Sequence, residues 1–199
     1  MLNIKILIVY IIIICTNFTI CHSKEIETIL NYFEKFQSLS ADFIQINNNG
    51  DILSGKILLK KPGKIRIEYN ETPLLIISNG KQLATINKKL KTIGFFSIEE
   101  LPVKLLLYDK IDKSMIKLVD VEELDNILRI RIRESSSTNQ GELEITFEKK
   151  PFRIAKWSVF NINQTKTEIL LSKLRFNSPI ENSVFDLDKE DPRIPFWKN

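Results

Sequence analysis

The chain is poor in the side chains that most catalytic and metal sites use. Its 199 residues include two cysteines and one histidine, and all three, Cys15, Cys21 and His22, lie near the start of the chain. Residues 24–199 therefore exclude a disulfide, a thiol nucleophile, a serine–histidine triad and a histidine-ligated metal. Carboxylate pairs, lysine, tyrosine and oxygen-ligand metal sites are the catalytic routes that remain open.

The chain also lacks a strong excess of charge of either sign. Its 29 basic and 25 acidic residues give a net charge of +4, and this excess is spread along the sequence. Such a balance does not favour nucleic-acid binding. Hydrophobic residues make up 43% of the chain and charged residues 27%, which is typical of a globular protein, and the length suits one domain.

The first 23 residues do not resemble part of a folded domain. Lys5 is the only charged residue before Lys24, an apolar run over residues 6–15 follows it, and Ser23 is a small residue at the end of the stretch. This arrangement is typical of a secretory signal peptide. We expect residues 1–23 to be cleaved on export and residues 24–199 to form one mature domain. An uncleaved anchor is disfavoured because the run is shorter than the roughly 20 residues of a spanning helix.

The hydrophobic spacing changes once along the mature chain. Over residues 24–39 the apolar side chains recur at helical spacing, which predicts a helix with one apolar face. From residue 41 the period is two, and it predicts strands at 41–46, 52–60, 64–69, 74–77, 82–87, 116–124, 127–133, 142–147, 152–160 and 165–176. A short helix that is apolar nearly all round is predicted over residues 102–108, with Pro102 in its first turn. The fold class is mainly β with short helices, built on a single curved antiparallel sheet.

The inward side chains of this sheet form the candidate binding site. Alternation directs eleven large apolar residues to the concave face: Ile57, Leu59, Ile65, Ile67, Tyr69, Leu128, Ile130, Ile132, Leu143, Ile145 and Phe147. Helices either fill such a face as an ordinary core or cover it loosely and leave a cavity for an apolar ligand. Periodicity does not separate these alternatives. Two short helices are too small to cover the whole concave face of a sheet of about ten strands, and this favours a cavity.

Several short motifs in the chain resemble those of a known family. They are Ala41-Asp42-Phe43-x-Gln45, the run from Gly55 to Tyr69 with its Lys61-Pro62-Gly63 turn, Ile77-Ser78-Asn79-Gly80-Lys81, Leu101-Pro102-x-x-Leu105-Leu106, Thr167-x-Ile169-x-Leu171 and Phe185-x-Leu187. With this ordered set the chain resembles the periplasmic lipoprotein carrier family, LolA, over almost all of residues 24–199.

The resemblance implies a fold, a function and partners. It implies an incomplete β-barrel with a helical lid, in which Phe33, Phe36, Leu105 and Leu106 cover an acyl-chain cavity. It implies a periplasmic monomer without cofactor or metal that takes lipoproteins from an inner-membrane release complex and passes them to an outer-membrane receptor similar to LolB. It implies no enzymatic activity. The family usually has a gating arginine where this chain has Lys61, which keeps the charge but lacks the planar fork of donors.

Three alternatives compete with a carrier. A carboxylate hydrolase would use Asp42 with Glu68, or Glu99 with Glu100, but the first pair lies on outward positions and the second is adjacent on a predicted helix, so neither pair faces across a cleft. A lipoprotein sensor or a LolB-like acceptor would be expected to carry a further domain or a lipidated cysteine. A structural all-β exported protein with a filled, dry core is the third alternative.

Overall fold

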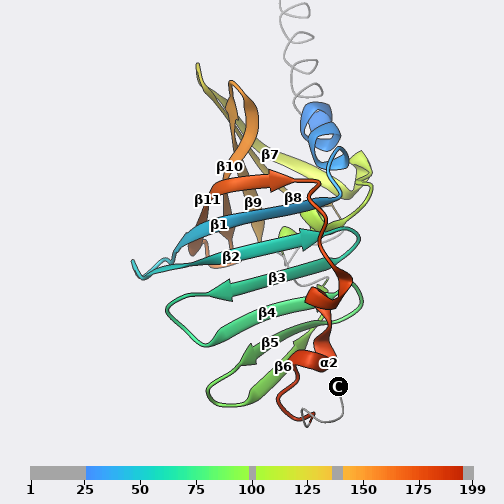
Figure 1. Cartoon of the computed structure of the whole chain (residues 1–199). Helices are drawn as coiled ribbons and strands as arrows, with labels where there is room; N and C mark the ends of the chain where they lie inside the picture. Colours follow the sequence, from blue (N-terminus) through green and yellow to red (C-terminus); the bar gives the residue numbers. More distant parts are fainter. Residues whose placement is uncertain (1–25, 99–101, 136–140, 195–199) are drawn as a thin grey trace, which may run out of the picture.

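The computed structural model describes residues 26–98, 102–135 and 141–194 and folds them around one open sheet of eleven antiparallel strands (Figure 1). The spatial order is β6-β5-β4-β3-β2-β1-β11-β10-β9-β8-β7, so two meanders join where β1 pairs with β11. The edge strands β6 and β7 do not pair with each other, which leaves the barrel incomplete as predicted. The strands are β1 (Ser38–Ile46), β2 (Ile52–Lys60), β3 (Lys64–Tyr69), β4 (Leu74–Asn79), β5 (Leu83–Asn87), β6 (Thr92–Phe96), β7 (Ile116–Glu123), β8 (Ile127–Glu134), β9 (Glu142–Lys149), β10 (Phe152–Phe160) and β11 (Lys166–Phe176).

The pairing of the strands stacks their apolar residues on one face. Ile57 of β2 lies opposite Ile67 of β3, and both point to the concave side of the sheet because side chains alternate along a strand.

Gly55 of β2 allows the backbone of β3 and the Phe43 ring to approach β2 closely. A Cβ at this position would lie 2.0 Å from the Glu68 carbonyl oxygen and 2.8 Å from the Phe43 ring, so no other residue fits without moving the backbone of β3.

Two short elements cover the concave face. Residues 26–34 are helical and lie near β7 and β8 (Figure 1). The second element is the 3-10 helix η2 (Pro102–Leu107), in which Leu105, Leu106 and Leu107 are all buried. A further 3-10 turn, η3 (Lys113–Met115), leads into β7. Within the described ranges, no helix has both the length and the apolar character needed to cross a bilayer.

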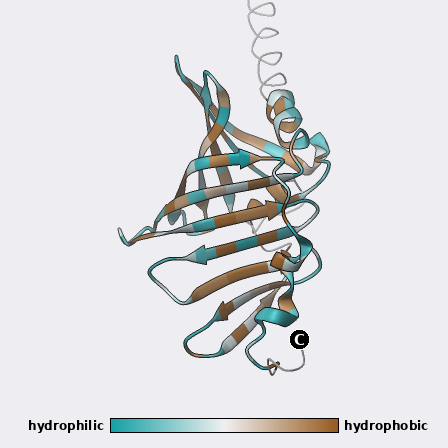
Figure 2. Cartoon of the chain, viewed as in Figure 1, coloured by the Kyte–Doolittle hydropathy of each residue, from teal (hydrophilic) through white to brown (hydrophobic). Residues whose placement is uncertain are grey.

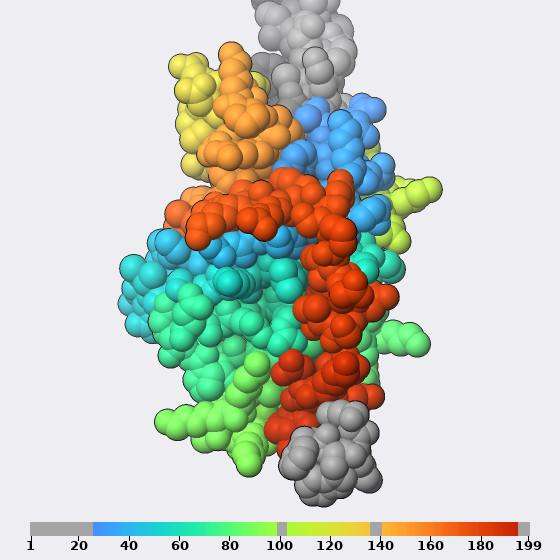
Figure 3. Space-filling view, in the orientation of Figure 1, coloured from blue at the N-terminus to red at the C-terminus, as the bar shows by residue number. Residues whose placement is uncertain are grey.

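A C-terminal strap, residues 177–194, packs on the opposite, convex face of the sheet. It contains η4 (Asn182–Phe185) and α2 (Leu187–Glu190), and Figure 3 shows it running down across the earlier strands. Its Leu187 packs with Leu75 and Ile77 of β4 and with residues of β5 in a second apolar cluster. This cluster explains why β4 is a continuous apolar strand (Figure 2), because a strand buried on both faces does not alternate.

Three expectations about secondary structure were wrong. Residues 38–40, expected to end the first helix, belong to β1. Residues 92–96, which are not among the predicted strands, form the edge strand β6, which pairs with β5 through Ala84 and Phe95. The turn before β6 was missed because its left-handed residue is Lys91, with φ of 54°, rather than a glycine. The segment after residue 179, for which no helix is among the predicted elements, contains the two short helices of the strap.

Candidate functional site

The structure gathers the predicted cavity residues into one cluster on the concave face. Nine of the eleven are buried, and Ile67 and Tyr69 are half-buried and pack against the same cluster. The four predicted lid residues, Phe33, Phe36, Leu105 and Leu106, are buried in it too. We call residues 26–36, which include the helical residues 26–34, and η2 the lid, because they close this face.

Aromatic rings fill the space under the helical part of the lid. The Tyr32 ring lies edge-on to Phe147 of β9 with 5.2 Å between centroids, and Phe147 stacks on Phe152 of β10 at 4.9 Å. The Tyr32 hydroxyl oxygen also accepts a hydrogen bond of 3.1 Å from the Ile154 backbone N–H, at the point where the register of β10 shifts. Burial raises the pKa of Tyr32, so the phenol stays protonated near neutral pH.

A narrow apolar pocket lies between the lid and the strands β7 and β8. The space in it that the centre of a water-sized sphere can occupy is about 10 Å³. The pocket is lined by Ile26, Ile29, Leu30, Phe33, Leu105, Ile111, Ile116, Ile130 and Ile132. A single water molecule needs roughly this much space, so this pocket is too small for an acyl chain in the arrangement described. A chain could enter this pocket only after part of the lid moved. Four of these lining residues were predicted site residues, and three more lie on the apolar stripe of the predicted helix. Ile111 was missed because it lies outside every predicted element, and Ile116, the first residue of a predicted strand, was not assigned to the inward row.

Lys61 joins the turn between β2 and β3 to the helical part of the lid. Its side chain is buried, with 6% of the residue exposed. Its Nζ donates a hydrogen bond of 2.6 Å to the Phe33 backbone oxygen and lies 4.6 Å from the centroid of the Phe36 ring. Because the last carbonyl groups of a helix have no partner within it, a cation is favourable at that end. Burial lowers the pKa of Lys61, and the charges of Asp109 and Glu34 oppose that shift.

The same turn also holds η2. The Gly63 backbone N–H donates a hydrogen bond of 2.9 Å to the Leu107 oxygen, and the Gly63 oxygen accepts one of 2.9 Å from the Ser78 hydroxyl. Gly63 has a φ of 70°, which favours glycine. One turn of three residues therefore contacts both parts of the lid and the neighbouring strand β4.

A buried ion pair also attaches η2 of the lid to β8. Lys104, with 3% of the residue exposed, places its Nζ 2.8 Å from Glu134 Oε2 at the end of β8. Sequence reasoning missed this pair. The signal was a single lysine inside the apolar run of residues 103–107, since lysine is rarely buried unless it is paired.

The carboxylates considered for hydrolysis do not form a catalytic pair. Asp42 is paired with Lys173 at 2.7 Å, and the hydrogen bond from Lys173 lowers the pKa of Asp42. Glu68 is paired with Arg66. The register places Lys56 between Asp42 and Glu68 on the convex face, so the two carboxylates do not face each other across a cleft.

The remaining candidates from the sequence are the second carboxylate pair, the signal segment and an oxygen-ligand metal site. Glu99 and Glu100 lie outside the described residues, as does the predicted signal segment 1–23. Among the residues that the structure describes, no group of three or more His, Cys, Asp or Glu could hold a metal ion.

Comparisons with known proteins agree with this architecture. The family described as "Outer membrane lipoprotein carrier protein LolA" matches residues 34–188. Protein RP864 of Rickettsia prowazekii (strain Madrid E) is 29% identical over 133 residues, which cover 65% of this chain and 61% of that protein's length. The match therefore spans about three fifths of the curated relative.

Two solved structures share the fold at low sequence identity. A conserved protein from Thermus thermophilus aligns with a TM-score of 0.51 and 9% identity, covering 82% of this chain and 92% of that one. A DUF1329 family protein from Desulfovibrio piger aligns with a TM-score of 0.51 and 11% identity, covering 82% and 95%. At these identities the likeness concerns the fold alone.

Proposed function

Because the chain belongs to the LolA family of outer membrane lipoprotein carriers, we propose that it is a periplasmic carrier that holds the acyl chains of lipoproteins against its concave face. The observation that carries the proposal is the β2–β3 turn. In this turn Lys61 and Gly63 each bond to one part of a short lid, over a face made of large apolar side chains. The family and the apolar face support a face that opens.

The energetics of such a site suit a carrier. Transfer of a methylene group from water to apolar surroundings is worth about 0.8 kcal/mol, so an acyl chain would leave the aqueous compartment readily. Opening the lid would expose part of the closed core, and this cost limits how tightly cargo is held. Cargo bound in this way is released when a partner offers its acyl chains an equally apolar surface.

Lys61 is proposed as the gating residue. When the lid is closed, burial of the Lys61 ammonium group costs free energy, and the same burial lowers its pKa. The hydrogen bond to the Phe33 oxygen offsets part of this cost. When the lid opens, water solvates the ammonium group and the desolvation cost is removed. A buried lysine therefore makes opening easier than a buried aliphatic side chain at the same position would.

The remaining parts of the proposal follow the family. Export would remove residues 1–23, the carrier would work as a monomer without cofactor, and it would meet an inner-membrane release complex and an outer-membrane receptor. It would have no enzymatic activity. The tight packing around the 10 Å³ pocket favours one competing function, a structural exported protein with a permanently filled core.

Mass analysis of the native protein separates these two functions. The exported protein is purified without detergent, and the material that co-purifies is extracted and identified. A carrier yields acylated cargo or fatty material in a fixed ratio to protein, and the Lys61→Leu variant retains more of it. A filled-core protein yields none, even after incubation with a triacylated lipopeptide, and that result would reject the proposal.

A further inference from the structure

The three most exposed large apolar side chains of the described residues all lie at one end of the sheet. Leu90 is 69% exposed, Ile162 is 67% exposed and Ile52 is 64% exposed. Single exposed apolar residues are common on protein surfaces, but these three lie on turns at the same end of the sheet. None of them belongs to the site under the lid.

Strand pairing brings their turns together along a loop rim, which we define as residues 47–52, 70–73, 87–91 and 161–165. The turns join β1 to β2, β3 to β4, β5 to β6 and β10 to β11. In an antiparallel meander, alternate turns lie at the same end of the sheet, and Figure 1 shows the first three turns along one side. The Lys166 backbone N–H donates a hydrogen bond of 3.4 Å to Asn48 Oδ1, so the fourth turn adjoins the first.

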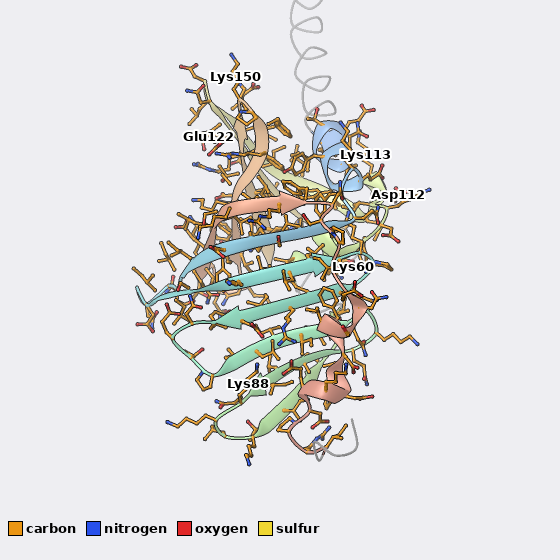
Figure 4. All side chains as sticks on the ribbon, viewed as in Figure 1. Lys60, Lys88, Asp112, Lys113, Glu122 and Lys150 are labelled. Carbon is orange, nitrogen blue, oxygen red and sulfur yellow. The ribbon has the colours of Figure 1, made fainter. Side chains whose placement is uncertain are left out.

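The turn that carries Leu90 is strongly basic. Lys88, Lys89 and Lys91 surround the leucine, and residues 87–91 include no acidic residue. Lys88, labelled in Figure 4, lies 3.7 Å from a Glu68 oxygen and 3.6 Å from a Glu190 oxygen. Lys89 and Lys91 form no ion pair within the described part of the chain, so their charges are available to a partner.

The turn holds its shape through local hydrogen bonds. Asn87 Oδ1 accepts from the backbone N–H of Lys89 at 3.1 Å and from that of Leu90 at 2.9 Å. The Lys88 backbone N–H donates to the Pro73 oxygen at 2.8 Å, which ties this turn to the next one on the rim. Leu90 is therefore presented outward by a fixed backbone.

We propose that the loop rim seats the protein on an anionic lipid surface, with Leu90 inserted among the acyl chains and Lys89 and Lys91 at the headgroup phosphates. An apolar tip flanked by cations suits the boundary between headgroups and hydrocarbon. A bilayer also accepts separate apolar tips on several turns, whereas a protein partner would need a continuous complementary surface. This membrane contact rests on the proposed function, because a carrier must approach a membrane. The contact itself does not require bound cargo.

Vesicle binding without cargo tests the contact independently of acyl-chain transport. Exported protein is mixed with vesicles of phosphatidylglycerol and phosphatidylethanolamine, or of phosphatidylcholine alone, and the bound fraction is measured by sedimentation. We expect binding to the anionic vesicles and weak binding to the neutral ones. Leu90→Ser should lower the partition coefficient by about tenfold, and the double variant Lys89→Glu/Lys91→Glu by at least about twentyfold.

Matched controls lie at other turns of the molecule. Leu124→Ser changes another exposed aliphatic residue, which is 50% exposed in the β7–β8 turn. Lys81→Glu changes an exposed lysine of the β4–β5 turn. Both variants should bind the vesicles as the wild type does. A polarity-sensitive dye on Leu90→Cys of the exported protein should shift to the blue on anionic vesicles, whereas a dye on Leu124→Cys should not. Equal binding by all variants, or a Leu90-dependent dimer in place of vesicle binding, would overturn the proposal. Failure of this assay with intact acyl binding would leave the proposed function standing.

Discussion

The Lys61 Nζ and the Phe33 backbone oxygen are 2.6 Å apart, and their hydrogen bond joins the end of β2 to the last turn of the lid helix. The donor is a cation buried beside the Phe36 ring, and the acceptor is a carbonyl group near the end of the helix. The bond therefore satisfies a carbonyl group near the helix terminus and attaches the helical part of the lid to the sheet. Loss of this contact is expected to change how the lid opens more than it changes the fold.

Substitution of Lys61 should separate cargo uptake from cargo release. Lys61→Arg keeps a cation and should be tolerated. Lys61→Leu should slow release, because the open lid no longer gains the solvation of an ammonium group while the attraction for acyl chains remains. The measurement is transfer of a radiolabelled lipoprotein to its outer-membrane receptor, with uptake at the inner membrane measured separately and Lys81→Leu as control. If Lys61→Leu performs both steps at the wild-type rate, Lys61 has no gating role.

The ion pair between Lys104 and Glu134 should stabilise the lid as a unit. Lys104→Met leaves the Glu134 carboxylate, which is 16% exposed, without this cation and should lower the free energy of unfolding by about 3 kcal/mol. The double variant Lys104→Met/Glu134→Gln should recover much of that loss, because neither charge of the pair remains. Urea denaturation of the wild type, the single variants and the double variant gives the coupling energy. A double variant as unstable as the sum of the single variants would contradict a direct pair.

Glu168 should make the fold sensitive to acid. Hydrogen bonds from Lys166 and Lys156 lower its pKa from 4.5 to about 2. The native state therefore holds the carboxylate ionised at a pH where the unfolded chain is protonated. This contribution is complete above the ordinary pKa and is lost as the pH falls toward 2. Glu168 is 24% exposed, so the contribution should be about 1 kcal/mol.

The variant Glu168→Gln provides the comparison. It should be less stable than the wild type at neutral pH, and the difference should shrink as the pH approaches 2. Thermal unfolding at a series of pH values measures the difference. A difference that stays constant across this range would assign the effect to packing rather than to the charge.

Export should leave a mature N-terminus at Lys24 or within a few residues of it. The basic start at Lys5 and the apolar run that follows it are the reason for this expectation. Intact mass of the protein recovered from the periplasm measures the processing site. Full-length protein recovered in the inner-membrane fraction would contradict cleavage and favour an anchor.

The strands could be predicted because their pattern is local. The bounds of β2, β3 and β10 agree with the alternation of side chains, and the inward rows agree with the observed apolar cluster. The strap could not be predicted in the same way. The uninterrupted apolar run of β4 was a sign that both faces of this strand are covered, but the covering residue Leu187 lies far along the chain.

The lid contacts were harder to predict for a physical reason. Lys61 bonds to a backbone oxygen, and Gly63 bonds through its own backbone to that of Leu107. Backbone groups are the same at every position, so neither contact has a signature in the sequence. The family resemblance pointed to Lys61 alone, and the part played by Gly63 became visible only in the fold. The filled pocket is likewise a property of packing, which hydrophobic spacing does not specify.

Acyl-chain binding to a variant of Ile67 shows whether the concave face holds the acyl chains of the cargo. Ile67 lies on the concave face but is only half-buried, so a carboxylate there should cost less stability than the several kcal/mol of charge burial in a tight core. Binding of a fluorescent triacylated lipopeptide is titrated against the wild type, Ile67→Glu and the control Leu170→Glu, whose site is 39% exposed on β11. Circular dichroism verifies that each variant is folded. The account predicts saturable binding to the wild type and to Leu170→Glu and none to folded Ile67→Glu. Wild-type protein that binds no lipopeptide, or Ile67→Glu that binds it equally well, would contradict the account.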